Sequence, residues 1–235
     1  MAHPDVSRIG GAMNGLPLLD DRMRRLLLES TQETLYMVMW SALIAIAVGL
    51  PIGILLATTQ RGGILAFPPV AWTLDFLVNI GRSLPFIILM VAIIPFTRAV
   101  AGSSIGTRAA IVPLAVAAIP FFARLAEGAI LEVDRGLIEM VQAAGGTTWQ
   151  VIAKALLPEA VPALVRGATL TVISLIGYSA MAGVIGGGGL GDLAYRYGYQ
   201  RFRGDVMIAT IVVLVVLVQG VQWIGNTIAN RLQRR

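Results

Sequence analysis

Three long stretches of this sequence contain no charged residue, and they constrain the fold more than any other feature. They cover residues 34–60, 167–191 and 206–230. A helix needs about 20 predominantly apolar residues to cross the hydrocarbon core of a bilayer, so each stretch is long enough to span a membrane. Charged residues make up only 13% of the chain, whereas soluble domains carry about 25%. A soluble enzyme, a disordered tail and a coiled coil are therefore excluded.

Two shorter apolar stretches predict further spans at residues 76–97 and 106–125. Each is long enough only if an arginine lies within the span and its head group reaches the interface, protein or water. The expected fold is an all-α, polytopic membrane helix bundle of about five transmembrane helices. Three spans with two re-entrant segments are the alternative. Residues 1–30 are expected to form an N-terminal tail and lead-in, and residues 31–235 the transmembrane domain.

The composition excludes several kinds of site. The chain has no cysteine and a single histidine, His3, so no metal, thiol or histidine-based site and no cofactor are expected. Its only lysine, Lys154, is followed by Ala155, so the GxxxxGK[ST] phosphate-binding loop is absent. The net charge of +5 fits basic loop residues at a membrane surface, and the bilayer rather than nucleic acid is the expected partner.

The polar loop at residues 132–158 is the most informative segment. Apolar residues recur at helical spacing over 137–144, which predicts a short amphipathic helix that ends at Gly145. Thr147, with a glutamine three residues later, predicts a capping box that starts a second short helix. Pro158 is expected to limit that second helix. The loop is either a docking element for a soluble partner or a surface helix that covers the end of the bundle.

The spacing within this loop resembles a known motif. Glu139, then Gly145 six residues later, then Leu157 and Pro158 resemble the EAA loop of bacterial ABC-importer permeases. The two alanines of the family pattern are replaced here by methionine and valine, and its isoleucine by alanine. The segments NIGRSLPFIILMVAIIPFTR, SSIGTRAAIVPLAVAAIPFFAR and GYSAM are similar to the methionine branch of this family.

The resemblance implies an ABC-importer permease fold in the bacterial inner membrane, with a cytoplasmic loop, the N-terminus outside and the C-terminus inside. Basic residues alone divide evenly between the two sides and do not orient the chain. The implied partners are a second copy of the chain, two copies of an ATP-binding cassette ATPase and a periplasmic or lipoprotein substrate-binding protein. Glu139 is expected to bond or cap at the docking helix, and Gly145 to permit the turn. Leu157 and Pro158 are expected to set where the loop rejoins the next span.

The expected function is that of a non-catalytic permease subunit in an ATP-driven importer of methionine or related amino acids. The alternatives are a permease for another small amino acid or peptide, an ion-coupled carrier and a membrane scaffold. Asp75 lies at the start of the second predicted span and Glu127 at the inner end of the third, and the first, fourth and fifth spans contain no acid. An ion-coupled carrier usually needs more ionisable groups within its spans.

The same resemblance places the GYSAM segment along the translocation path. Tyr178, Ser179 and Met181 of this segment are therefore candidates for residues that line the path. Met181 is also a candidate gate, because its flexible thioether can plug the path and yield to a passing apolar side chain. Ordinary packing in the bundle is the alternative. Arg82 is a further candidate for contact with the path, against the alternative that its side chain extends to the interface.

Overall fold

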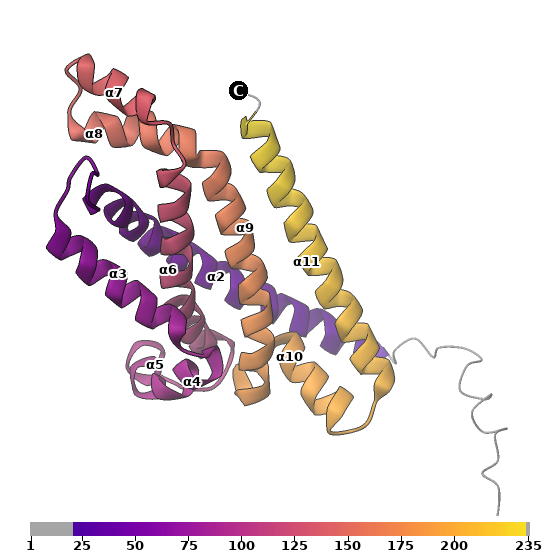
Figure 1. The fold of residues 1–235 in the computed structure, drawn as a ribbon. Coiled ribbons are helices and arrows are strands. Elements are labelled where there is room, and N and C mark those ends of the chain that lie inside the picture. Colours follow the sequence, from indigo (N-terminus) through magenta and orange to yellow (C-terminus); the bar gives the residue numbers. More distant parts are fainter. Residues whose placement is uncertain (1–20, 234–235) are drawn as a thin grey trace, which may run out of the picture.

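The computed structural model describes residues 21–233, and every regular element in this range is a helix (Figure 1). Residues 1–20 of the expected N-terminal tail lie outside the described residues. The helices are α2 (Asp21–Thr59), α3 (Pro68–Ser83), α4 (Phe86–Ala92), α5 (Ile94–Ala101), α6 (Thr107–Leu131), α7 (Arg135–Ala143), α8 (Thr148–Val151), η1 (Ile152–Leu156), α9 (Leu157–Ala182), η2 (Gly183–Gly187), α10 (Gly189–Leu193), η3 (Ala194–Tyr199) and α11 (Gly204–Gln233).

Four helical segments are long and apolar enough to cross a membrane, and a fifth is a bent pair. The four are α2, α6, the continuous run Thr148–Gly187 and α11. Figure 1 shows α7, α8 and the last described turn of α11 at one end of the bundle, which we call the loop end, and α4, α5 and α10 at the opposite end. The prediction of an all-α bundle with about five spans is confirmed.

The second predicted span consists of separate helices with a sharp bend, so the expectation of one continuous helix over residues 76–97 is wrong. Helix α3 ends at Ser83, and α4 leaves it at an angle of 103°. Leu84 is extended, with φ −84° and ψ 127°, because the residue before a proline is disfavoured in the helical region. Pro85 itself has no N–H to continue the helical ladder. The sequence RSLPF therefore encodes the bend locally.

Helices α2 and α6 form the centre of the bundle. A Cβ added to Gly53 of α2 would lie 2.6 Å from the Cβ of Ala126 in α6. Gly49 and Gly53, spaced as GxxxG, leave the room that this close packing of α2 on α6 requires. The largest group of buried side chains includes Met37 of α2, Leu114 of α6 and Leu175 of α9.

Pro158 does not end the preceding helix, which corrects the expectation for this residue. Helix α8, the π-helical turn η1 and helix α9 form one continuous helical run. Pro158 lies in the first turn of α9. A proline within a helix meets the carbonyl four residues earlier, here that of Lys154. Lys154 lies in the five-residue turn Ile152–Leu156, whose wider backbone accommodates the ring.

Glycines end the helical run at the opposite end of the bundle. Gly186 has φ +91°, and Gly188 and Gly189 also have positive φ, which L-residues with a side chain rarely adopt. The chain reverses there and forms α10, which packs against α2 and α9 before α11 returns (Figure 1). Gly186, Gly188 and Gly191 match the GxGxxG spacing of dinucleotide-binding turns, but here the segment joins membrane helices and follows a helix instead of a strand.

Candidate coupling loop and its adjoining cavity

The loop at residues 132–158 folds as helix, turn and helix. Asp134 accepts a 2.6 Å hydrogen bond from the N–H of Gly136 and so caps the start of α7. Gly145 has φ +77°, which reverses the chain after α7. The N–H of Thr147 donates to Gln150 Oε1 at 2.8 Å, and the Gln150 N–H donates to Thr147 Oγ1 at 3.4 Å. The predicted amphipathic helix, turn and capping box are confirmed.

The apolar face of α7 anchors the loop to the bundle. Leu137, Ile138 and Val141 pack against a buried cluster contributed by α2, α6, η1 and α9. Met140 lies on α7 with a largely exposed side chain, and Trp149 is exposed at the start of α8. The loop is therefore packed on the ends of α6 and α9 and presents Met140 and Trp149 outward.

Glu139, which was expected to bond or cap at the docking helix, does not lie at the capping position of α7. It is exposed in the middle of α7, beyond the first turn where a side chain reaches the free amides. Asp134 makes the cap instead. Leu157 is half-buried and packs against the cluster under the loop, and Pro158 beside it is exposed. Three of the four predicted loop residues thus lie where the loop turns or rejoins the bundle.

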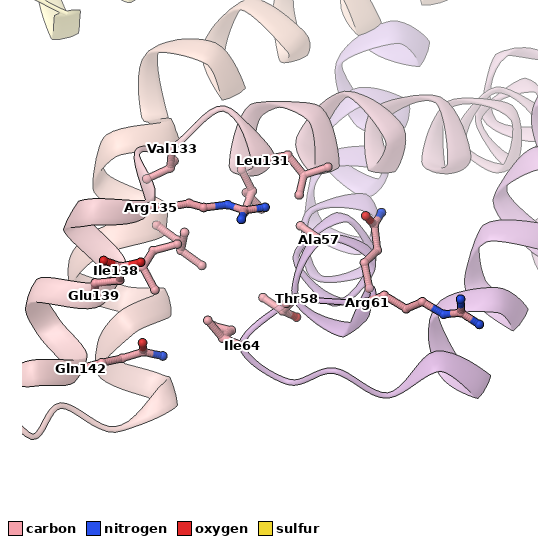
Figure 2. Close-up of a pocket in the computed structure, with 15 residues that line it drawn as sticks. Ala57, Thr58, Arg61, Ile64, Leu131, Val133, Arg135, Ile138, Glu139 and Gln142 are labelled. Atoms are coloured by element: carbon pink, nitrogen blue, oxygen red, sulfur yellow. The ribbon is translucent and has the colours of Figure 1, made fainter.

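A cavity of about 330 Å³ separates α7 from the turn that follows α2. Figure 2 shows the side chain of Arg135 crossing it from α7 toward Ala57, whereas Arg61 extends away from α7. Glu139 and Gln142 line the α7 side. The contact between α7 and the end of α2 is therefore incomplete, and this gap leaves room for α7 to shift relative to α2.

The candidate path residues on α9 face different surroundings. Met181 is 42% exposed. The ring of Tyr178 stacks on Phe86 of α4, with 4.9 Å between centroids and 8° between planes. Ser179 is only 2% exposed and donates a 2.7 Å hydrogen bond to the carbonyl of Ile176. Met181 is thus the accessible member of the three.

Arg82 lies apart from these residues. It is exposed in the last turn of α3, immediately before the bend that starts α4. Within the described part of the chain it makes no side-chain hydrogen bond or ion pair. The structure therefore joins Tyr178 to α4 without bringing Arg82 into the same cluster.

A network of charged and amide side chains near the loop end was not predicted. Arg124 donates to Asp75 at 2.6 Å, to Asn79 at 2.8 Å and to Glu127 at 2.6 Å. The Asn79 amide donates to Asp75 at 3.0 Å, and the Gln60 amide donates to Glu127. An arginine and a glutamate three residues apart in an otherwise apolar span were the available signal, since such residues are costly unless they are paired.

A second unpredicted contact lies at the opposite end. Glu33 accepts a 2.7 Å hydrogen bond from the N–H of Gly189, and Thr34 Oγ1 accepts one of 2.9 Å from the N–H of Leu190. These bonds satisfy two amides at the start of α10 from the first span. The sequence marks Glu33 only as the boundary of an uncharged stretch.

The fold defines a class: a helical membrane protein with a helix–turn–helix loop packed on one end and without the GxxxxGK[ST] phosphate-binding loop. The comparison of sequences is consistent with that class. Residues 49–234 match the family described as binding-protein-dependent transport system inner membrane component, and the chain belongs to this family. It is therefore an inner-membrane transport component.

Curated relatives make the comparison more specific. The chain is 51% identical over 210 residues to the probable D-methionine transport system permease protein MetI of Vibrio cholerae, covering 89% of this chain and 93% of the relative. It is 50% identical over 165 residues to the D-methionine transport system permease protein MetI of Escherichia coli K12, covering 70% and 76%.

Solved structures match the fold as well. A chain from inward-facing conformations of the MetNI methionine ABC transporter superposes with a TM-score of 0.89 at 48% identity, covering 91% of this chain and 99% of that one. An amino acid ABC transporter with histidines gives a TM-score of 0.74 at 16% identity, covering 98% and 100%, and supports the fold alone. The predicted ABC-importer permease fold is confirmed.

Proposed function

We propose that this chain is the membrane-spanning permease subunit of an ATP-driven importer of methionine or closely related amino acids. It contributes the path through the membrane and performs no covalent chemistry. ATP is hydrolysed on a separate ATP-binding cassette subunit. The identity of about 50% to methionine permeases over most of the chain supports this substrate class.

The observation that carries the mechanism is the anchored loop. Helix α7 packs its apolar face on the cluster that joins the ends of α6 and α9, while Met140 and Trp149 remain exposed. When a partner binds these exposed side chains in a groove and moves, the movement is transmitted to α6 and α9 together. Gly145 sets the angle between the two arms of the loop through its left-handed backbone.

The assembly contains two copies of this chain and two ATPases on the side of the loop, which is cytoplasmic. In the described structure, the loop and the last turn of α11 lie at one end, and α2 begins at the other (Figure 1). This arrangement supports an N-terminus outside and a C-terminus inside. A periplasmic or lipoprotein substrate-binding protein delivers the substrate at the opposite end of the bundle.

ATP binding closes the ATPase pair, moves both loops and switches the shared path between outward and inward access. Met181, the accessible candidate on α9, is a gate residue in this mechanism. Tyr178 and Ser179 support its helix through the stacking on α4 and the buried hydrogen bond, respectively. Arg82 lies at the α3–α4 bend, where it meets the interface or the path.

The first test is a mild-detergent affinity purification of the chain from its native host. The expected result is an equimolar ATPase with a phosphate-binding loop, and methionine uptake that requires ATP when the complex and its binding protein are reconstituted in liposomes. Flux without an ATPase would indicate a carrier, and association without flux would indicate a scaffold. ATP-driven uptake of another amino acid with no methionine uptake would overturn the substrate assignment alone.

A further inference from the structure

The network around Arg124 connects three elements close to the coupling loop. Gln60 directly follows the end of α2, Asp75 and Asn79 lie on α3, and Arg124 and Glu127 lie on α6. The loop begins where α6 ends, about two helical turns beyond Arg124. The network therefore lies on the part of α6 that adjoins the coupling loop.

The network contains one contact that holds neighbouring helices together by charge. The pair between Arg124 and Glu127 lies within α6, three residues apart, and stays formed when α6 moves as a unit. The pair between Arg124 and Asp75 crosses from α6 to α3. Glu127 is 3% exposed and also accepts from Gln60, which joins the end of α2 to the same centre.

Glu127 is the buried member of the network, whereas the side chains of Arg124 and Asp75 are 27% and 47% exposed. Charged groups in a span are tolerated when they pair with one another inside the protein. The network meets this condition for Glu127 and for two of the three Arg124 nitrogens. Arg124 Nε is buried without an acceptor in the part of the chain that the structure describes. The ion pairs therefore hold the network together although one Arg124 donor has no hydrogen-bond acceptor.

We propose that Arg124 is a positioning residue for energy coupling, which makes the loop-end parts of α2, α3 and α6 move as one body. The Asp75–Arg124 contact transmits the displacement of the coupling loop from α6 to α3, and from there across the α3–α4 bend to the helix that stacks on Tyr178. This inference rests on the proposed importer function and assigns a role to a cluster outside the coupling loop.

The test measures methionine transported per ATP hydrolysed in the reconstituted complex with its ATPase and binding protein. Asp75→Asn keeps the size of the side chain and removes the charge opposite Arg124, and it is expected to lower this ratio about fivefold while ATP hydrolysis continues. Asp75→Glu restores a carboxylate and is expected to recover most of the ratio. A loss of stability alone would lower both rates together and leave the ratio unchanged.

The matched control is Asp192→Asn. Asp192 pairs with Arg196 four residues away, within one continuous segment at the opposite end, so the same chemical change breaks an ion pair that joins no two spans. Its transport per ATP is expected to equal that of the unmodified chain. An equal fall in this control would show that the effect is a general consequence of losing an ion pair and would overturn the proposal.

A distance measurement tests the one-body motion directly. The chain has no cysteine, so paired labels are specific. Leu77→Cys on α3 and Gly128→Cys on α6 replace exposed residues, and a side chain at Gly128 meets no atom within 4 Å. Spin-labelled chain is mixed with an excess of unlabelled chain, so that each complex carries one labelled copy. The distance between the two labels is then measured without nucleotide and with ATP bound but not hydrolysed.

The expected distance is the same in both states for the unmodified chain and differs between them after Asp75→Asn. A distance that already changes in the unmodified chain, or full coupling in Asp75→Asn, would overturn the inference. Absence of any ATP-dependent transport by the unmodified complex would instead overturn the proposed function, so the two failures are distinguishable.

Discussion

The carboxylate of Glu33 accepts a 2.7 Å hydrogen bond from the backbone N–H of Gly189, and so joins the first span to the start of α10. A Cβ on Gly189 would lie 2.6 Å from Thr34 Oγ1 and 2.7 Å from the Cε of Met37. Only glycine permits this approach, and its φ of +76° favours glycine as well. The opposite end of the bundle is therefore held by a tight backbone contact to α2.

Replacing Glu33 by alanine is expected to destabilise this end. The variant loses a hydrogen bond to a charged acceptor, and because Glu33 is exposed we expect a cost of about 1 kcal/mol, below the usual range for such bonds. Thermal unfolding of the purified chain in detergent measures the change. Glu29→Ala, one turn earlier on the exposed surface of α2, is the control and should unfold like the unmodified chain.

Replacing Gly53 by leucine is expected to separate α2 from α6. The added side chain meets Ala126 Cβ and the carbonyl oxygen of Ala123 within 2.7 Å, and overpacking of this kind costs about 1–3 kcal/mol. The unfolding temperature of the detergent-purified chain should fall accordingly. Gly177→Leu adds the same side chain where no atom lies within 4 Å of the Cβ, and its unfolding temperature should stay close to the original.

Replacing Gly145 by valine is expected to uncouple ATP hydrolysis from transport. The φ of +77° is strained for a β-branched residue by about 1–3 kcal/mol, so the turn between α7 and α8 changes its angle. Transport per ATP in proteoliposomes should fall several-fold. Gly145→Asn should retain coupling, because asparagine tolerates the left-handed region; normal uptake by the valine variant would refute the role of this turn.

Replacing Met181 by alanine tests the gate. The variant removes an exposed thioether from α9 while leaving the buried Ser179 hydrogen bond in place. We expect ATP hydrolysis to continue and methionine transport to change about twofold or more, measured as uptake in proteoliposomes alongside phosphate release. If both rates stay at the level of the unmodified chain, Met181 is a packing residue and the gate lies elsewhere.

Much of the fold was predictable because its signals are local. The uncharged stretches at 34–60, 167–191 and 206–230 became parts of membrane-spanning helices. The capping box at Thr147 and the turn at Gly145 formed as expected, because each depends on residues within one turn of the chain. The break at Leu84 was equally local, but the apolar pattern over the proline concealed it.

The sequence by itself determined that this chain crosses a membrane and that a polar loop with two short helices interrupts its spans. Hydrophobic length and backbone preference act between near neighbours, so one sequence suffices to detect them. Only the tertiary structure decided that Arg124 meets Asp75 and that Glu33 meets Gly189. These pairs are far apart in the chain and form because the packing of the helices brings polar groups of different helices within hydrogen-bonding distance of one another.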